Sequence, residues 1–599
     1  MPNDQRRPVD AGRRGFILGA GGGLLAAGSG AVLAVGAPST GHATSNATGN
    51  DWDRVTDVLV IGSGAAGFSA ALFARQAGAQ VLMLEKGPVP GGTTLRSGGV
   101  HYIPNNRFLR AAGVADPRED FLRLAVRMSY PDRYRPRAER YGAGAAEYAL
   151  LEAFYDQAAP TVDRLTELGI VDYLPFIDYD DRPFPDNYAE LPENRAPRGR
   201  GMVCQPKTRR EGRFYYRNGG GVGVDLIELL QSAAQARDIA ILTRHAAIEL
   251  VRDGAGEVLG VVCEHRGQRL RIGARRGVVF ASGGYIHDAE LRARHLLGPV
   301  YGGCGAPTNR GDFLRLAAGA GAALGNLQHG WWMELLLEEA LASSDAPTGV
   351  WVVPGDSSLA VNLAGERYVN EKNHPGSRPR AHFVWDPVRG DYPQRVTLMI
   401  WDSRTVQHRG GVMGVQKPDA PLPGHVMQGE DWPGLAKAIA ARLDKLRPQI
   451  GELELAPDFA KRLEATVARY NEFARRGVDE DFQRGAAAAD IAWNYFGNLP
   501  VIPSEYPNPT LHPLAPQGPY FAAFLVAGAI DSKGGPLIDT NAQVLTAAGA
   551  PVGGLFGAGN CIASPTGGAY WGGGGTIGPA VVFGQIAGNA AARAPVRSL

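Results

Sequence analysis

Cysteine is scarce in this chain, which has four cysteines in 599 residues. Cys204, Cys263, Cys304 and Cys561 lie far apart and form neither C-x-x-C nor C-x-x-C-H, which excludes a zinc ribbon and a covalently attached haem. A disulfide between distant cysteines stays open, but we favour buried small hydrophobic side chains. H-E-x-x-H is absent too, and the 12 histidines are scattered, so the sequence predicts no metal site.

An excess of charge is also missing, because 61 basic residues nearly balance 60 acidic ones. This balance gives no basis for binding nucleic acid. Beyond the N-terminus no apolar run reaches the length of a membrane span, so we expect at most peripheral membrane association. The length and the 44% hydrophobic content are typical of a globular protein with two or more domains.

The N-terminus is predicted to be a targeting segment outside the fold. Arg13 and Arg14 precede a glycine-rich apolar run that ends near Val35, and small residues at 41–43 offer a cleavage point. This pattern resembles a twin-arginine (Tat) signal peptide at residues 1–43, and it predicts export to a periplasmic or other extracytoplasmic location. A transmembrane anchor is the alternative, although the run is weakly hydrophobic for one.

A glycine turn follows the first buried strand. Residues 58–61 are apolar and run into Gly62-Ser63-Gly64-Ala65-Ala66-Gly67, after which an alanine-rich helix pattern continues to about residue 77. In G-x-G-x-x-G turns the glycines permit a tight turn, backbone approach to a pyrophosphate, and helix packing on the strand. Chance matches are expected among 81 glycines, but the flanking strand and helix favour a dinucleotide site over an unliganded turn.

The next segments carry further cofactor contacts. An apolar strand at 80–84 ends in Glu85-Lys86, at the spacing where a carboxylate accepts hydrogen bonds from ribose hydroxyls. The loop 91–99, GGTTLRSGG, would let backbone and hydroxyls contact a pyrophosphate closely. An ordinary surface loop is the alternative, which the position directly after the acid disfavours. The contacts expected in this loop are Gly92, Thr93, Thr94, Ser97, Gly98 and Gly99.

Later glycine turns decide which dinucleotide is bound. Cofactor contacts are expected from Ala281, Gly283, Asp312, Gly559, Asn560, Gly575, Thr576 and Ile577. The last three precede an apolar helix whose N-terminus suits the electron-rich N1/C2=O side of a reduced flavin. A nicotinamide enzyme has no need of this returning C-terminal segment, so the sequence predicts FAD.

These patterns predict an α/β fold. A two-dinucleotide-binding-type FAD domain, with a parallel sheet and a β-meander, should carry an inserted α+β substrate (capping) domain. The expected boundaries are 52–330 for the first part of the FAD domain, with a helical and loop insertion at 104–215, then 331–530 for the capping domain and 531–599 for the return. Within the insertion we expect helices at 118–128 and 145–168 and a long irregular loop at 175–213.

The motifs GGTTLRSGG followed by IPNN, NRGDF, GERYVNE, GVDEDF, SKGG, LFGAGN and AYWGGGGTIGPA give the chain a family resemblance. From residue 57 to 592 it resembles the FAD-dependent 3-ketosteroid dehydrogenases within the fumarate reductase/succinate dehydrogenase flavoprotein family. The resemblance implies that Tyr570 and the Gly574 N–H hold a substrate carbonyl, and that FAD is bound non-covalently, because Thr93 and Thr94 stand where covalent relatives have histidine.

The resemblance also shows departures at the positions of proton transfer. Four positions after Glu371, where the family has tyrosine or arginine, this chain has Pro375, and Phe154 replaces a second family tyrosine. We therefore name the neighbours His374 and Tyr155 as candidate catalytic residues. The dicarboxylate pattern is missing too, since Asp531 and Trp571-Gly572 stand where reductases carry histidine and arginine. A carboxylate-reducing role is thereby disfavoured.

The leading hypothesis is an exported dehydrogenase that desaturates a hydrophobic, 3-ketosteroid-like ketone at its α,β carbons, with hydride transfer to flavin N5. Its electrons would pass to a quinone or a separate carrier, because the sequence encodes no haem or iron–sulfur motif. An ene-reductase of an unsaturated carbonyl compound and a non-catalytic flavin electron carrier are the alternatives.

Overall fold

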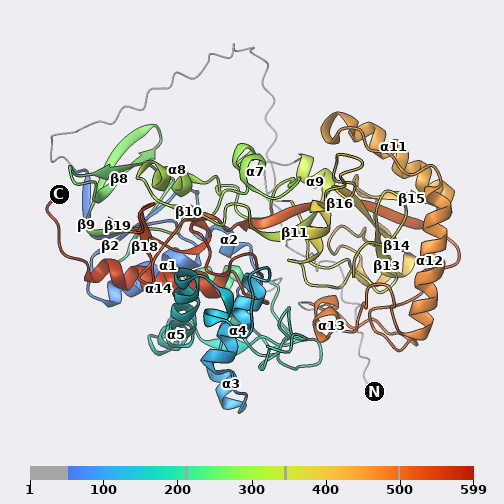
Figure 1. Ribbon diagram of the computed structural model, residues 1–599, viewed down its shortest axis with the longest axis horizontal. Coiled ribbons are helices and arrows are strands. Elements are labelled where there is room, and N and C mark those ends of the chain that lie inside the picture. The colour runs from blue at the N-terminus through green and yellow to red at the C-terminus, as the bar shows by residue number, and fades with distance from the viewer. Residues whose placement is uncertain (1–51, 209–212, 343–346, 497–498) are drawn as a thin grey trace, which may run out of the picture.

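The computed structural model describes residues 52–208, 213–342, 347–496 and 499–599, so the twin-arginine segment lies outside the described residues. Two lobes lie side by side along the long axis (Figure 1). One is built around a mainly parallel sheet with helices α1 (Ala65–Gln76) and α14 (Ile577–Arg593), and the other around an antiparallel sheet flanked by α11 (Trp432–Ile450) and α12 (Phe459–Arg476).

The first lobe has the sheet order β18-β19-β9-β1-β2-β6. These strands are β18 (Gln543–Leu545), β19 (Pro551–Gly557), β9 (Gln268–Phe280), β1 (Arg54–Ile61), β2 (Val81–Glu85) and β6 (Ala240–Thr243). The apolar run in β1 is buried because it pairs in parallel with β2 on one side and β9 on the other. Strands β7 (Ala246–Arg252) and β8 (Val258–His265) continue antiparallel from β9 as the expected meander. The predicted α/β fold is confirmed.

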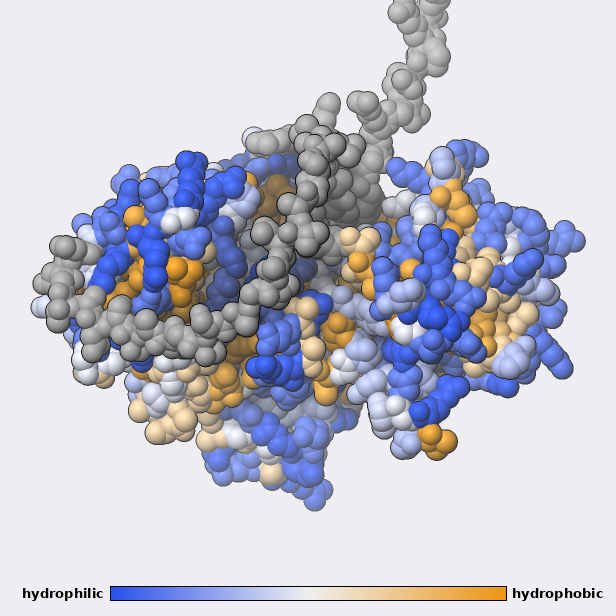
Figure 2. All heavy atoms as spheres, turned by 90° about the horizontal axis from the view of Figure 1, so that it is seen from above, coloured by the Kyte–Doolittle hydropathy of each residue, from blue (hydrophilic) through white to orange (hydrophobic). Residues whose placement is uncertain are grey.

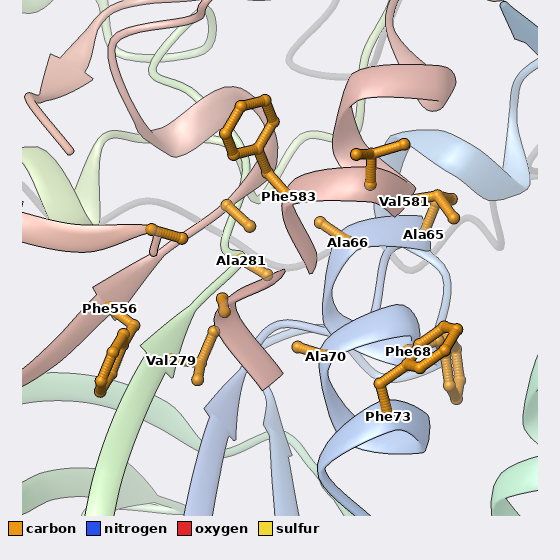
Figure 3. Packing of buried hydrophobic residues seen from close by; sticks show 14 of the residues in the cluster. Ala65, Ala66, Phe68, Ala70, Phe73, Val279, Ala281, Phe556, Val581 and Phe583 are labelled. Atoms are coloured by element: carbon orange, nitrogen blue, oxygen red, sulfur yellow. The ribbon is translucent and has the colours of Figure 1, made fainter. Parts of the chain in front are cut away.

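Helix α14 lies directly against α1. A methyl group at Gly584 would meet the Ala66 carbonyl oxygen at 2.4 Å, and one at Gly588 would meet the Ala70 carbonyl oxygen at 2.2 Å. The Ser69 hydroxyl also donates to the Val581 carbonyl at 2.6 Å. Figure 3 shows the small alanines of α1 facing the α14 segment above the ends of the strands. The middle of α14 therefore packs against the N-terminal half of α1.

The insertion contains the expected helices and a small sheet that we did not predict. Helices α4 (Arg118–Ser129) and α5 (Ala145–Glu167) agree with the helical patterns, and the short α3 (Arg107–Ala111) was not predicted. The segment predicted as irregular contains β5 (Gly201–Cys204), which pairs with both β3 (Val100–Tyr102) and β4 (Tyr173–Pro175). The prediction was wrong here because β5 gains its partners from segments far away in the chain, which local patterns do not reveal.

The second lobe has a sheet in the order β12-β11-β16-β14-β13, with β15 beside β16. Its strands are β11 (Gly330–Leu336), β12 (Gly349–Val350), β13 (Ser358–Val361), β14 (Val396–Asp402), β15 (Met427–Gly429) and β16 (Tyr520–Ser532). The whole of β16 is buried. Strands β11 and β16 run from the middle of the molecule into this lobe, so they connect it to the first (Figure 1).

Shorter elements surround the two sheets. They are α2 (Gly92–Leu95), α6 (Gly223–Gln235), α7 (Ala289–His295), α8 (Asp312–Gly319), α9 (Leu337–Ala342), α10 (Ser403–Arg409), α13 (Ala488–Asn494), β10 (Leu324–Gly325) and β17 (Gly535–Pro536). Short 3₁₀ turns are η1 (Glu139–Gly142), η2 (Arg378–Phe383) and η3 (Gly559–Cys561). None of the helices within the described ranges is both long and apolar enough to cross a bilayer. On the face in Figure 2, hydrophilic side chains predominate and hydrophobic ones form separate patches.

Substitution of Gly67 tests the close contact of α1 with the turn before it. An alanine methyl at this position would lie 2.0 Å from the Gly62 carbonyl oxygen. We expect Gly67→Ala to lower the free energy of unfolding by about 1–3 kcal/mol through overpacking, and to reduce the flavin content of the purified protein. Gly319→Ala, where nothing lies within 4 Å, is the matched control. Equal unfolding curves for the two variants would contradict this packing.

Candidate active site

The first glycine turn combines close packing with one open edge. Gly62 has a φ of +102°, and a methyl group there would lie 2.4 Å from the Ala281 carbonyl oxygen. At Gly64 a methyl group would make only ordinary contacts, 3.6 Å from Thr94 Oγ1 and 3.8 Å from the Gly91 carbonyl oxygen. Thus Gly62 and Gly67 are required for packing, whereas Gly64 leaves space at the N-terminus of α1. A pyrophosphate can bind only where the backbone N–H groups at a helix N-terminus are accessible, as they are here.

The acidic residue after β2 is fixed by the same turn. Glu85 Oε2 accepts hydrogen bonds from the Ser63 N–H at 3.1 Å and the Ser63 hydroxyl at 2.5 Å, and Oε1 accepts one from the Gly87 N–H at 2.6 Å. A carboxylate offers about four acceptor positions, so capacity for a ribose hydroxyl remains. Lys86, next in the chain, is paired with Asp312 of α8 at 2.8 Å. The structure therefore joins these two predicted cofactor residues to each other.

The two threonines of α2 connect the cofactor loop to separate segments. Thr94 Oγ1 accepts from the Ala65 N–H at 3.1 Å, at the start of α1. Thr93 Oγ1 accepts from the Ala306 N–H and from Asn309 Nδ2, each at 3.0 Å. Both hydroxyls are thus held by hydrogen bonds to other segments, and their contact with the cofactor stays a prediction. Ser97 closes the loop, since its hydroxyl donates to the Thr94 carbonyl.

Asp531 connects both lobes beneath this loop. Its Oδ2 accepts from the Gly284 N–H at 2.8 Å, from Asn309 Nδ2 at 2.7 Å and from Asn560 Nδ2 at 3.2 Å. Asn560 in turn accepts from Trp331 Nε1 at 2.9 Å. Burial raises the pKa of Asp531 from 3.8 to about 6. The predicted cofactor residue Asn560 is thereby held between β11 and β16.

The glycines of the later turns allow close approach to this network. Gly283 has a φ of +75°, and a methyl group there would lie 2.6 Å from Asn309 Oδ1. Gly559 has a φ of +76°, and a methyl group there would lie 3.0 Å from Ala66 Cβ. A small pocket beside α14 is lined by Gly559, Asn560 and Thr576 among other residues. The turn at Gly559 therefore lies at the surface of a pocket next to the start of α14.

The loop before α14 carries Tyr570 and, four residues later, a backbone N–H that no hydrogen bond among the described residues uses. A methyl group at Gly575 would lie 3.0 Å from the Tyr570 ring, and Trp331 packs edge-on against this ring at 5.7 Å. Gly574 has a φ of +90°, and among the described residues no hydrogen bond uses its N–H. Burial raises the pKa of Tyr570, so its hydroxyl stays protonated. A phenol and an N–H are therefore available to one ligand oxygen.

Two segments hold this loop from outside. The Tyr102 N–H donates to the Gly574 carbonyl at 3.1 Å, and Asn187 Nδ2 donates to the Tyr570 carbonyl at 2.9 Å. Tyr102 is itself bonded to Asp186 at 2.9 Å, and Asp186 forms an ion pair with the buried Arg200. The insertion thus orients the backbone that presents the Gly574 N–H.

The segment at residues 374–377, where the proton-transfer residue was expected, passes beside Tyr570. A methyl group at Gly376 would lie 2.9 Å from Tyr570 Cβ, so the chain at Pro375 passes beside that tyrosine, as the family pattern implies. His374 Nε2 lies 2.7 Å from the Ser377 hydroxyl, and burial lowers the pKa of its ring to about 3. No contact among the described residues joins His374 to Tyr570, and its catalytic role stays a prediction.

Phe154 and Tyr155, neighbours in the helical insertion, make contacts with different parts of the structure. Phe154 is fully buried with its ring 5.4 Å from that of Trp571, next to the Tyr570 loop. Tyr155 instead donates its hydroxyl to the Asp116 carbonyl at 2.6 Å and packs against Phe121. Phe154 therefore lies next to the loop before α14, which we call the reaction loop. The Tyr155 hydroxyl makes its hydrogen bond elsewhere, to Asp116. A catalytic role for Tyr155 also stays a prediction.

Several residues that hold the site were absent from our predictions. They are Tyr102, Asn187, Arg200, Tyr216 and Trp331. Tyr216 has the one sequence signal that could have been used, because it directly precedes the glycine-rich turn at 218–221 that leads into α6. The other four act through contacts between distant segments. All four cysteines are free, and three of them are buried, as we expected.

Comparison with known proteins identifies the family. Residues 57–577 match the family described as FAD binding domain. The chain belongs to this family. It is 31% identical to 4-oxocyclohexanecarboxylate 2-dehydrogenase of Sinomonas cyclohexanicum, over 89% of this chain and 92% of that protein. It is 30% identical to 3-oxosteroid 1-dehydrogenase of Mycobacterium tuberculosis, over 89% of this chain and 97% of that protein.

Solved structures agree with this assignment. The 3-ketosteroid delta1-dehydrogenase from Sterolibacterium denitrificans, in complex with 1,4-androstadiene-3,17-dione, has a TM-score of 0.75 and 25% identity. The match covers 90% of this chain and 99% of that one. A flavocytochrome c3 fumarate reductase shares the fold with a TM-score of 0.59 and 23% identity. The resemblance seen in the sequence is thus confirmed, and the chain is an FAD-dependent oxidoreductase that acts on CH–CH groups.

The raised pKa of Asp531 predicts a pH-dependent stability. Because its pKa is higher in the folded protein than in the unfolded chain, the folded state binds more protons between these values, and stability falls as pH rises from about 4 to 6. Asp531→Asn lacks the titrating carboxyl and should not lose stability in this way. The free energy of unfolding of the variant, relative to that of wild type, should therefore increase by up to about 3 kcal/mol between pH 4 and pH 7.

Denaturant unfolding of both proteins at the two pH values measures this change. Asp419→Asn is the matched control, because that side chain is exposed. We expect the control to follow wild type at both pH values. If the free energies of unfolding of wild type and Asp531→Asn differ by the same amount at both pH values, the carboxyl does not titrate in this range.

Proposed function

We propose that this protein is a dehydrogenase of hydrophobic cyclic ketones, 3-ketosteroid-like, and that it introduces a double bond between the α and β carbons. The observation that carries the proposal is the pairing of the buried Tyr570 phenol with the free Gly574 N–H in one loop. The names of the relatives support it, since they are dehydrogenases of oxo compounds with six-membered carbocycles.

Removal of a proton next to a ketone develops negative charge on the carbonyl oxygen. Donors already oriented toward that oxygen stabilise the charge more strongly than water does, because they need no reorganisation. Tyr570 provides an O–H that burial keeps protonated, and Gly574 provides an N–H whose orientation Tyr102 fixes. The chemistry that FAD supplies when bound is acceptance of the β-hydrogen as a hydride at ring atom N5.

The surroundings of the loop favour an apolar substrate. Phe176 lies 3.2 Å from where a methyl group at Gly573 would be, and its ring is stacked on Phe184 at 4.5 Å. Trp351 and Trp493 form another stacked pair, 6.1 Å apart. Aromatic faces of this kind bind hydrophobic rings and exclude water from a developing enolate.

Anaerobic addition of ketones to the holoprotein tests this function. We expect 4-androstene-3,17-dione or 4-oxocyclohexanecarboxylate to bleach the flavin absorbance band. Tyr570→Phe should lower the rate of bleaching by about 100-fold or more, as expected for the loss of one such donor, with its FAD content unchanged. Tyr148→Phe, on the half-buried face of α5, is the control for loss of a phenol.

Two other outcomes would give a different answer. A flavin that stays oxidised with every ketone, while the chemically reduced protein is reoxidised by enones, would favour an ene-reductase over this dehydrogenase. Turnover that is equal in wild type and Tyr570→Phe would exclude the proposed carbonyl contact. The electron acceptor is proposed to be a quinone or a separate carrier, and rates with soluble quinone analogues test it.

We also propose that the protein is exported through the Tat route. Support comes from the sequence alone, in which Arg13 and Arg14 precede the apolar run. Replacement of both by lysine should keep the precursor in the cytoplasm of a Tat-competent bacterial host, whereas wild type should reach the periplasm as a shortened, FAD-loaded protein. Equal distribution of the two proteins between the fractions would contradict this route.

A further inference from the structure

Tyr216 carries a hydroxyl for which the described part of the chain provides no hydrogen-bond partner. The side chain belongs to the segment before α6, and only 4% of the residue is exposed. Its hydroxyl is buried and has no hydrogen-bond partner within the described residues. A buried hydroxyl without a hydrogen-bond partner is destabilising. A ligand oxygen that accepts a hydrogen bond from this hydroxyl would explain why the chain has tyrosine here.

The neighbours of Tyr216 are aromatic and fix its ring. Phe176 packs edge-on against it at 5.0 Å, Phe214 at 5.7 Å and Phe496 at 6.3 Å. Because these contacts hold the ring, the direction of the hydroxyl is set before any ligand arrives. The same Phe176 also reaches Gly573 of the reaction loop. Tyr216 and that loop therefore both contact the same side chain, Phe176.

The hydroxyl points at the cofactor loop. A methyl group at Gly98 would lie 2.2 Å from the Tyr216 hydroxyl oxygen, and Gly98 is one of the predicted cofactor residues. Burial raises the pKa of Tyr216, and the nearby phenol of Tyr570 raises it further. Both phenols are therefore neutral donors that interact with each other, and among the described residues the Tyr216 hydroxyl has no hydrogen-bond partner.

We propose that the Tyr216 hydroxyl donates a hydrogen bond to the ketone oxygen of the substrate, as a second phenol beside Tyr570. This inference rests on the proposed function, because it deepens the same carbonyl site. Three donors then converge on one oxygen, from Tyr216, Tyr570 and the Gly574 N–H. Tyr216 reaches that oxygen from the segment before α6, whereas the other two come from the C-terminal return.

The holoenzyme variant Tyr216→Phe tests this contact. We expect its kcat/KM with 4-androstene-3,17-dione and 4-oxocyclohexanecarboxylate to fall on the order of 10- to 100-fold, with most of the loss in kcat, since the enolate develops only in the reaction. Tyr215→Phe is the matched control, one residue away, with its hydroxyl 3.5 Å from the Thr208 carbonyl. The control should retain wild-type kinetics.

Thermal unfolding distinguishes a ligand contact from a structural role. Because the hydroxyl has no partner among the described residues, Tyr216→Phe should leave Tm unchanged or raise it. Binding of 1,4-androstadiene-3,17-dione to the oxidised holoprotein, followed through the flavin spectrum, should weaken in the same variant. A lowered Tm, or a loss of FAD affinity with unchanged ketone binding, would overturn the proposal.

The outcomes separate this inference from the function on which it rests. If wild type binds and oxidises no ketone, the proposed function fails and this contact fails with it. If wild type is active and Tyr570→Phe is impaired while Tyr216→Phe is not, the function stands and the second phenol is excluded. Impairment of both variants, with Tyr215→Phe unaffected, supports the proposal.

Discussion

The close contact between α1 and α14 is the constraint on which the site depends. Two helices can approach this closely only where one of them lacks side chains, and Gly584 and Gly588 provide those positions. The contact joins the first helix of the folded chain to the last one. As a result, the position of α14, and with it the loop that precedes α14, is fixed relative to α1 by backbone packing.

A second set of contacts fixes the orientation of that loop, and it consists largely of buried charge. Arg200 lies between Asp116, at 2.6 Å, and Asp186, and all three side chains are almost completely buried. Buried ion pairs contribute little net stability, because desolvation offsets their attraction, but their geometry is specific. Asp186 also accepts a hydrogen bond from the Tyr102 hydroxyl, and the Tyr102 N–H donates to the Gly574 carbonyl. The buried charges are therefore connected to the backbone of the loop before α14.

The sequence predicted the features that are local and missed those that are not. The strand before Gly62, the acid at Glu85 and the helix after Thr576 are each encoded in one short segment, and the structure has all three. Strand β5 and the bond from Asn187 to Tyr570 depend on pairing between segments far apart in the chain. Hydrophobic periodicity carries no information on such pairing. For the same reason the sequence could name Tyr570 and not the residues that hold it.

The ionisation states around the Tyr570 loop are those expected of a site for a ketone oxygen. Burial keeps the Tyr570 phenol and the His374 ring uncharged at neutral pH. Neutral donors stabilise charge that appears on an oxygen during a reaction, whereas an oxygen that is already anionic in the substrate needs a permanent cation beside it. Asp531, moreover, adds negative charge above about pH 6. A site of this kind discriminates in favour of a neutral carbonyl group that becomes an enolate only after proton removal.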